Sequence, residues 1–228
     1  MKKIVLFISI LMISVAVNAQ VNEATFRLMG GLSLPNYKYS LDGASASRNV
    51  NQGFSGALML SFYTSDNSDI ADLGLNIGGH IGFNYTQKGA VNKNLSGQGQ
   101  VKADNRINYF QGDAMGSIGF GKKRSKGTFI DICAGTYLAY AMNGKQKIEL
   151  SDGTSLDTDF KFGTATSDDF IKFDLGLKTG LLFTISSRYS IAAMYEYGLS
   201  DIAPQESLKI QNRNFLVTAG INFGYKKR

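Results

Sequence analysis

The 228-residue sequence contains one cysteine, two prolines and no tryptophan. A lone cysteine excludes an internal disulfide, and we expect Cys133 to be a small apolar residue within a strand. After residue 20 there is no second long apolar run, so no membrane-spanning helix is predicted there. A basic face is also lacking: the net charge is +6 but charges of both signs are dispersed, which argues against a nucleic acid partner.

The N-terminus has the pattern of an export signal. Two lysines precede an apolar run over Ile4–Val17, and a small-residue cleavage site follows near Ala19. No cysteine follows the run, so a lipoprotein anchor is not expected. We therefore predict a signal peptide over residues 1–19 and a single exported domain over 20–228.

The strongest pattern in this domain is an alternation of apolar and small polar residues with a period of two. In Leu73–Thr86, for example, Leu75, Ile77 and Ile81 alternate with glycine, asparagine and His80. Successive side chains of a strand point to opposite faces, so one face is apolar and the other is polar. We predict eight such strands: Ala24–Leu34, Gly53–Thr64, Leu73–Thr86, Arg106–Phe120, Thr128–Met142, Phe170–Thr184, Tyr189–Leu199 and Asn214–Tyr225.

The connections between these strands alternate in length. The long ones are Pro35–Gln52, Gln87–Asn105, Asn143–Asp169 and Ser200–Arg213. The short ones are Ser65–Asp72, Gly121–Gly127 and Ile185–Arg188. Outer-membrane barrels combine long external loops with short periplasmic turns. We therefore predict an all-β fold, a single antiparallel eight-stranded up-and-down transmembrane β-barrel in the outer membrane, with both termini in the periplasm.

The polar face is expected to line the inside of this barrel. Eight strands enclose a space only wide enough for side chains to fill. The ionisable residues predicted on this face are Arg27, His80, Asp113, Asp131, Lys172, Asp174, Lys178 and Glu196. Charges of both signs enclosed together can pair, which offsets part of their desolvation. We predict an internal polar network with little pore activity.

Aromatic residues gather near the ends of the predicted strands. They are Tyr37, Tyr39, Phe62, Tyr63, Tyr85, Tyr109, Phe110, Tyr140, Phe170, Tyr197, Phe223 and Tyr225. Transmembrane barrels carry aromatic girdles at both membrane interfaces. These residues are therefore predicted to lie, in part, in two girdles.

Several of these segments together carry a resemblance to a known family. They are Phe170–Leu177, Tyr195–Ile202, Asn212–Asn214 and Gly220–Phe223, with earlier echoes at Gly82–Gly89 and Gly135–Tyr140. In order and spacing the chain resembles the PorT-like outer-membrane β-barrel domain of the Bacteroidetes type. The resemblance implies an eight-stranded outer-membrane barrel. It implies no single activity, although the namesake is linked to protein secretion.

The chain departs from the family pattern in two places. Asn105–Gln111 lacks the usual apolar and proline-bearing run, and a basic tail, Lys226–Arg228, follows Tyr225. Substrates of the barrel assembly machinery usually end on an aromatic residue, a role that Tyr225 would fill here. The basic tail and the basic turn Lys122–Lys126 are both expected at the periplasmic rim, in contact with solvent, anionic lipid or an acidic partner.

Enzymatic and metal-binding functions have little support in the sequence. A lipopolysaccharide-modifying hydrolase needs serine, histidine and an acid facing lipid, whereas His80, the single histidine, is predicted to face inward. The aspartates of the third long connection lack the spacing of a calcium loop. They are Asp152, Asp157, Asp159, Asp168 and Asp169. We expect no catalytic residue, metal or cofactor.

Alternation alone does not say which face lies inside, so two arrangements fit the sequence: a membrane barrel with the apolar face outside and a soluble barrel with the apolar face inside. A soluble lipocalin-like barrel would enclose the apolar face around a ligand, but the alternating loop lengths and the strand lengths favour the membrane protein. We expect a monomeric, non-enzymatic barrel with an envelope structural, interaction or secretion-associated role. Its expected partners are outer-membrane lipid, the barrel assembly machinery and a periplasmic or secretion-system protein.

Overall fold

The computed structural model describes residues 23–41, 44–47, 49–64, 74–93, 100–121 and 127–223. The predicted signal peptide, the basic turn Lys122–Lys126, the short connection Ser65–Asp72 and the basic tail lie outside these residues. Within the described part of the chain, no helix is long and apolar enough to cross a membrane.

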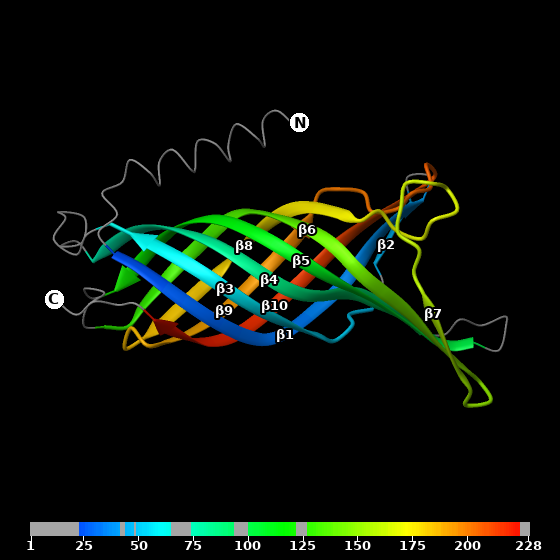
Figure 1. Cartoon of the computed structure of the whole chain (residues 1–228), viewed down its shortest axis with the longest axis horizontal. Helices are drawn as coiled ribbons and strands as arrows, with labels where there is room; N and C mark the ends of the chain where they lie inside the picture. Colours follow the sequence, from blue (N-terminus) through cyan, green and yellow to red (C-terminus); the bar gives the residue numbers. More distant parts are fainter. Residues whose placement is uncertain are drawn as a thin grey trace.

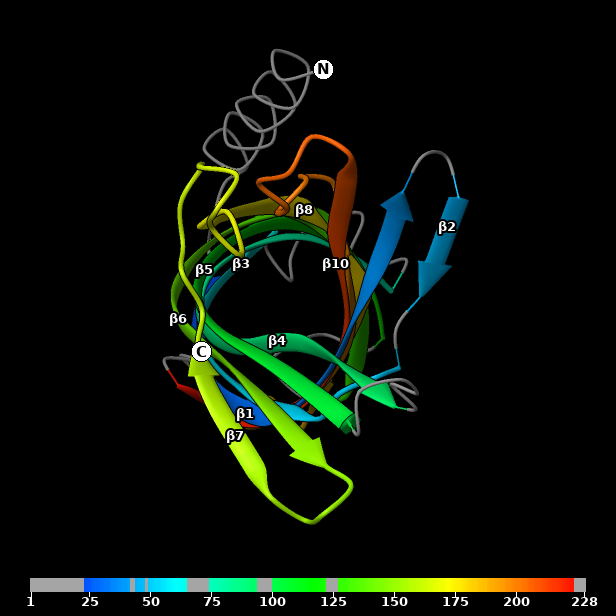
Figure 2. The same ribbon diagram turned by 90° about the vertical axis from the view of Figure 1, so that its right-hand side faces the viewer.

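Eight antiparallel strands form a closed ring, which Figure 1 shows from the side and Figure 2 nearly along its axis. In ring order they are β1 (Glu23–Leu41), β3 (Gly53–Tyr63), β4 (Leu75–Lys93), β5 (Gln100–Gly121), β6 (Phe129–Leu150), β8 (Phe173–Ile185), β9 (Tyr189–Gly198) and β10 (Leu208–Phe223). The ring closes where β10 pairs with β1, from Phe26 opposite Phe223 to Leu41 opposite Leu208. The predicted eight-stranded up-and-down barrel is confirmed.

Two further strands lie in the long connections, which were predicted as loops. β2 (Ala44–Ser47) pairs with β1, and β7 (Ser155–Asp159) pairs with β6. Both lie at the end of the barrel opposite the start of β1 and the end of β10 (Figure 1). We call this the outer end, and the other the inner end.

Five of the barrel strands also run farther toward the outer end than the alternation predicts. Most of the predicted loop Gln87–Asn105 is strand, because β4 continues to Lys93 and β5 already begins at Gln100. Backbone pairing needs only N–H and C=O groups, so a hairpin continues after its outward face stops being apolar. The apolar pattern marks the membrane-facing part of each strand rather than its end.

A β-bulge marks this transition in the β5–β6 pair. Asn108 lies opposite Asn143 and Tyr109 opposite Ala141, so Met142 has no register partner on β5. Met142 and Asn143 are consequently both exposed. Before them the residues of β6 that face inward have odd numbers, and after them they have even numbers. Lys145 and Lys147 are thereby directed outward.

The outward face of the barrel is a continuous apolar surface. Its exposed side chains include Phe26, Leu28, Leu32, Phe54, Leu58, Ile77, Ile81, Phe83, Phe110, Ile118, Ile132, Leu138, Leu177, Leu181, Ile191, Phe215, Val217 and Ile221. Soluble monomers rarely expose contiguous apolar patches of more than a few hundred Å². The chain therefore forms a transmembrane barrel, and the lipocalin-like arrangement is wrong because the apolar face lies outside.

The apolar surface also has the height of a membrane span. On β1 it extends from Phe26 to Leu34, and on β10 from Phe223 to Phe215, nine residues on each strand. A tilted strand needs about 9–11 residues to cross the hydrocarbon core.

The predicted aromatic girdles are correct only for some residues. Tyr140, Tyr197, Phe110 and Phe223 are exposed on the outward face. Four others are buried instead: Tyr37, Tyr63 and Tyr109 occupy inward positions of barrel strands, and Phe170 lies in the connection before β8. Tyr225 lies outside the described residues.

A lysine at Leu58, midway along the outward face of β3, is expected to destabilise the barrel in lipid by about 2–4 kcal/mol. The matched control is Leu156→Lys, since Leu156 is similarly exposed (52% against 58%) but lies in β7 beyond the apolar surface. Urea titrations in vesicles, followed by gel mobility of unheated samples, measure the difference. Equal costs for the two substitutions would contradict the membrane-facing assignment.

Candidate functional site

The inside of the barrel is filled by four layers of side chains, alternately polar and apolar. Along β1 from the inner end they are represented by Arg27, Met29, Ser33 and Tyr37, all of which are buried. We call them the Arg27 cluster, the methionine layer, the central network and the outer cap. Since the sequence predicted only a polar inner face, the two apolar layers were not anticipated.

The Arg27 cluster is organised around one buried guanidinium group. Arg27 is 1% exposed and donates hydrogen bonds to Ser61 Oγ (3.0 Å), Thr184 Oγ1 (3.0 Å) and Tyr63 OH (2.7 Å). Its Nη1 also donates to Ser190 Oγ. These partners come from β3, β8 and β9, so the fork-shaped donor set of arginine links strands on both sides of β1.

The same cluster contains the residue types of a serine hydrolase. Ser61 Oγ lies 2.9 Å from His80 Nδ1, and Tyr63 OH donates to Asp131 Oδ2 at 3.1 Å. Ser61, His80 and Asp131 are each no more than 1% exposed, and all three face the inside of the barrel. The acyl chains of the membrane lie on the opposite face of the sheet from these three side chains.

The methionine layer separates the Arg27 cluster from the central network. It comprises Met29, Met59, Met115, Cys133, Leu182, Ala192, Met194 and Leu216, with Ala57 packed against it. The flexible thioether side chains occupy hollows that glycines leave: a Cβ at Gly180 would lie 2.8 Å from Met194 Sδ. Cys133 is fully buried within β6, as predicted.

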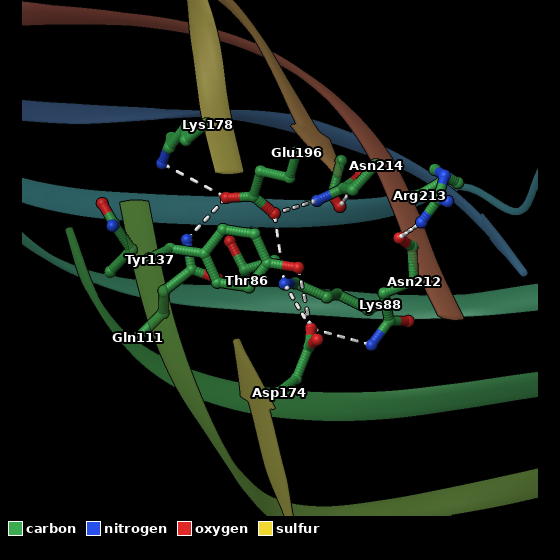
Figure 3. Close-up of polar contacts among 12 residues, drawn as sticks. Thr86, Lys88, Gln111, Tyr137, Asp174, Lys178, Glu196, Asn212, Arg213 and Asn214 are labelled. Carbon is green, nitrogen blue, oxygen red and sulfur yellow. Dashed lines mark hydrogen bonds and ion pairs between the residues drawn. The ribbon is translucent and has the colours of Figure 1, made fainter. Parts of the chain in front are cut away.

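The central network is built on five charged side chains, of which Figure 3 shows four. Glu196 bridges two lysines, with Oε2 3.2 Å from Lys88 Nζ and Oε1 3.2 Å from Lys178 Nζ. Lys88 also pairs with Asp174 at 3.1 Å, and Lys178 with Asp113 at 2.5 Å. All five are at most 6% exposed, so two cations and three carboxylates are enclosed together.

Neutral donors satisfy the remaining carboxylate oxygens. Asn214 donates to Glu196 Oε2 at 3.1 Å, and Gln111 donates to Oε1 at 2.5 Å. Tyr137 OH and Asn212 donate to Asp174 Oδ2 at 3.0 and 2.9 Å (Figure 3). Buried ion pairs are tolerated when such hydrogen bonds offset their desolvation. Lys88 Nζ also lies 3.9 Å from the centre of the Tyr137 ring, a cation–π contact.

Seven of the eight predicted lumen residues are buried inside the barrel, in two separate groups. Arg27, His80 and Asp131 belong to the Arg27 cluster, while the central network contains Asp113, Asp174, Lys178 and Glu196. The methionine layer keeps the two groups apart, so they do not form the single network that was expected.

The prediction for Lys172 is wrong. Lys172 lies in the bend before β8, where the strand alternation has not begun, and its side chain is exposed, with Nζ 5.7 Å from the Tyr140 ring centre. Lys88, by contrast, was missed because it fell in a predicted loop. Continuing the inward sequence of Asn84 and Thr86 by one step would have found it.

The outer cap closes the barrel above the central network. Its buried residues are Tyr37, Ala90, Ile107, Tyr109, Tyr137, Ala139, Ala141, Phe170, Ile202, Ala203 and Ile210. Two of the long connections contribute to it, joined where Ile171 N donates to Ile202 O at 2.8 Å. The cap therefore combines barrel residues with loop residues that show no strand alternation.

Three of the five aspartates of the third long connection serve as local backbone caps, while Asp159 pairs with Lys145. Asp152 accepts from Thr154 N, Asp168 from Ala165 N and Asp169 from Lys161 N, each at 2.8 Å. The bond from Thr154 lowers the pKa of Asp152. Among the described residues, no group of three or more histidine, cysteine or acidic side chains is placed to hold a metal ion.

Comparison with known proteins finds similarity only among solved structures. No protein-family model and no curated protein matches the chain, so the PorT-like resemblance stays a prediction. Ail of Yersinia pestis is 17% identical, over 88% of this chain and 99% of its own, with a TM-score of 0.39. Neisserial surface protein A is 14% identical, over 90% of this chain and 100% of its own, with a TM-score of 0.40. OprG of Pseudomonas aeruginosa is 12% identical, over 89% of this chain and 97% of its own, with a TM-score of 0.35. At this identity the likeness concerns the fold alone.

Replacing Lys88 with methionine is expected to cost about 3–5 kcal/mol of unfolding free energy, because Asp174 and Glu196 lose a buried counter-charge. The control is Lys102→Met, since Lys102 pairs with Glu149 at 3.2 Å in a part-exposed position and should cost at most about 1 kcal/mol. Urea unfolding in vesicles measures both. Similar values for the two variants would contradict a sealed network, and Lys88→Met/Asp174→Asn should recover part of the loss.

Proposed function

We propose that this protein is an integral β-barrel of the outer membrane with a sealed lumen, which acts in the envelope as a structural or interaction protein and not as a channel or an enzyme. The observation that carries the proposal is the filling of the barrel by four successive side-chain layers. Two of them are apolar, so a hydrated ion would have to shed water at the methionine layer and again at the outer cap.

The export signal and the distribution of connections support this location and orientation. The connection between β8 and β9 is a tight turn in which Ser186 and Ser187 both have positive φ, as type I′ hairpin turns require. It lies at the inner end, where β1 begins and β10 ends, and β2 and β7 lie at the outer end (Figure 1). The inner end is therefore assigned to the periplasm, with both termini, and the outer end to the cell exterior.

The proposed partners follow from this placement. They are outer-membrane lipid around a monomeric barrel, the barrel assembly machinery, and a periplasmic or secretion-system protein at the inner rim. A secretion-associated role rests on the PorT-like resemblance alone, which is a fold-level analogy. Cross-linking in intact envelopes, followed by affinity purification, identifies such a partner.

A lipid-modifying enzyme is the second candidate, because of the 2.9 Å contact between Ser61 Oγ and His80 Nδ1. The direction of these side chains argues against it. Both are enclosed in the lumen, whereas acyl chains lie against the outward face.

In planar bilayers the purified chain is expected to give no steady single-channel current, because both apolar layers exclude hydrated ions. Insertion is verified independently by the mobility of unheated samples on gels, and a porin measured in the same bilayers provides the positive control. Large, steady conductance from an inserted barrel would refute the sealed lumen.

Lipid A incubated with the protein is expected to keep its full set of acyl chains in mass spectra, as it does without protein. His80→Ala should give the same spectrum. Deacylation by the wild-type chain that disappears in His80→Ala would overturn the non-enzymatic assignment and establish the second candidate.

A further inference from the structure

The outward face of the β1–β10 pair changes from apolar to basic at one level. Leu34 lies opposite Phe215. In the next row of this face, two residues closer to the outer end, Asn36 lies opposite Arg213. The rows beyond pair Lys38 with Gln211 and Ser40 with Lys209. Rows two residues apart along a strand are separated by about 7 Å. The basic residues therefore follow immediately after the lipid-facing surface, at the depth of lipid head groups.

We call Lys38, Lys209 and Arg213 the basic seam. All three share the outward face, because they are separated by even numbers of residues from Leu34 or Phe215. Lys209 is exposed and Lys38 half-buried, and neither forms an ion pair with another residue that the structure describes. The nearest acid in sequence, Glu206, lies in the turn before β10. The charges of Lys38 and Lys209 are therefore available to an external anion, whereas Arg213 is buried, with 7% of its surface exposed.

Arg213 is held in a fixed position at the lower edge of the seam. Its guanidinium carbon lies 3.5 Å from the ring centre of Tyr197, which is itself part of the outward apolar surface. Nη1 donates to Gly198 O at 2.9 Å and to Asn212 O at 2.8 Å. Its Nη2 also lies 3.4 Å from Gln211 Oε1, so the buried guanidinium group is held by protein partners and fixes the Tyr197 ring beside the two lysines.

The β5–β7 side of the outer end is also basic, but three of its cations form ion pairs with acidic residues nearby. On β5–β7, Arg106 lies 3.6 Å from Asp104, Lys145 lies 3.6 Å from Asp159, and Lys102 lies 3.2 Å from Glu149. These cations are already paired and are not left for an external anion. This difference distinguishes Lys38 and Lys209 from these three cations.

We propose that the basic seam binds the phosphate groups of a phosphorylated glycolipid in the outer leaflet, whose acyl chains lie against the apolar surface directly below. This inference rests on the proposed function, since it requires the outer end to face the outer leaflet. Lys38 and Lys209 attract the phosphate, the buried Arg213 holds the Tyr197 ring in place, and Leu34, Phe215 and Tyr197 contact the lipid chains.

The test compares two lipids on the full chain refolded in detergent, by native mass spectrometry at constant ionic strength. The probes are lipid A carrying two phosphates and lipid A of the same acylation with both phosphates removed. The wild-type chain is expected to bind the phosphorylated form about tenfold more tightly or better, and Lys38→Gln/Lys209→Gln should lose most of this preference.

The matched control is Lys102→Gln/Lys145→Gln, which removes the same charge at the same end of the barrel from two lysines that already have acidic partners, and should keep the preference. An equal affinity of the wild-type chain for both lipids, or an unchanged preference in Lys38→Gln/Lys209→Gln, would overturn the inference. Inorganic phosphate at millimolar concentration should not compete; competition would assign the seam to free phosphate and overturn the lipid assignment.

The folded state of each sample, read from gel mobility and from partition into vesicles, separates this inference from the proposed function. A barrel that inserts but shows no phosphate preference refutes the inference alone. A chain that does not insert refutes both.

Discussion

Closure of the sheet between β1 and β10 is the constraint on which the rest of this structure depends. A closed sheet has no free edge, so every backbone group of the spanning part pairs within the barrel, as a hydrocarbon environment requires. Closure also assigns each of the two faces to one environment. Because the apolar face lies against lipid, the residues of the other face have no solvent except one another, and their charges must be satisfied inside.

The central network shows how this requirement is met. Glu196 on β9 forms ion pairs with both Lys88 on β4 and Lys178 on β8, and Lys88 forms a second ion pair with Asp174 on β8. Lys178 and Glu196 lie on neighbouring strands, whereas both pairs of Lys88 and the pair of Lys178 with Asp113 on β5 connect strands that are not neighbours in the ring. The network acts as a set of cross-links through the lumen, and its removal from water is offset only because amide and phenol groups complete the hydrogen bonding.

The apolar layers give the same lumen a second property. Met29, Met59, Met115 and Met194 come from four strands and meet in one layer, where their unbranched side chains fill the space between two polar groups. The outer cap repeats this arrangement with aromatic residues and with loop segments. The lumen is thus filled by both polar and apolar side chains, and the surfaces left for recognition are the outer end, the rims and the lipid-facing face.

The sequence predicted correctly the residues that lie within the alternating part of a strand, and it failed for residues near the ends of that part. Arg27, Asp174, Lys178 and Glu196 were predicted inside because the outward neighbours in their strands are apolar. Lys88 was missed and Lys172 misplaced because both lie near the point where an apolar face ends. At such points the continuation of a strand depends on backbone pairing with a neighbour, for which the side-chain pattern carries no signal.

The amino-acid sequence by itself determined the architecture, namely eight strands, the identity of the lipid-facing residues and the enclosure of charge, because the period of two is a local property of each strand. Only the tertiary structure decided which enclosed charges meet, since Lys88 and Glu196 are 108 positions apart in the chain yet 3.2 Å apart in the lumen. It also decided which cations stay unpaired at the outer rim, because the register between β1 and β10 arises only when the sheet closes.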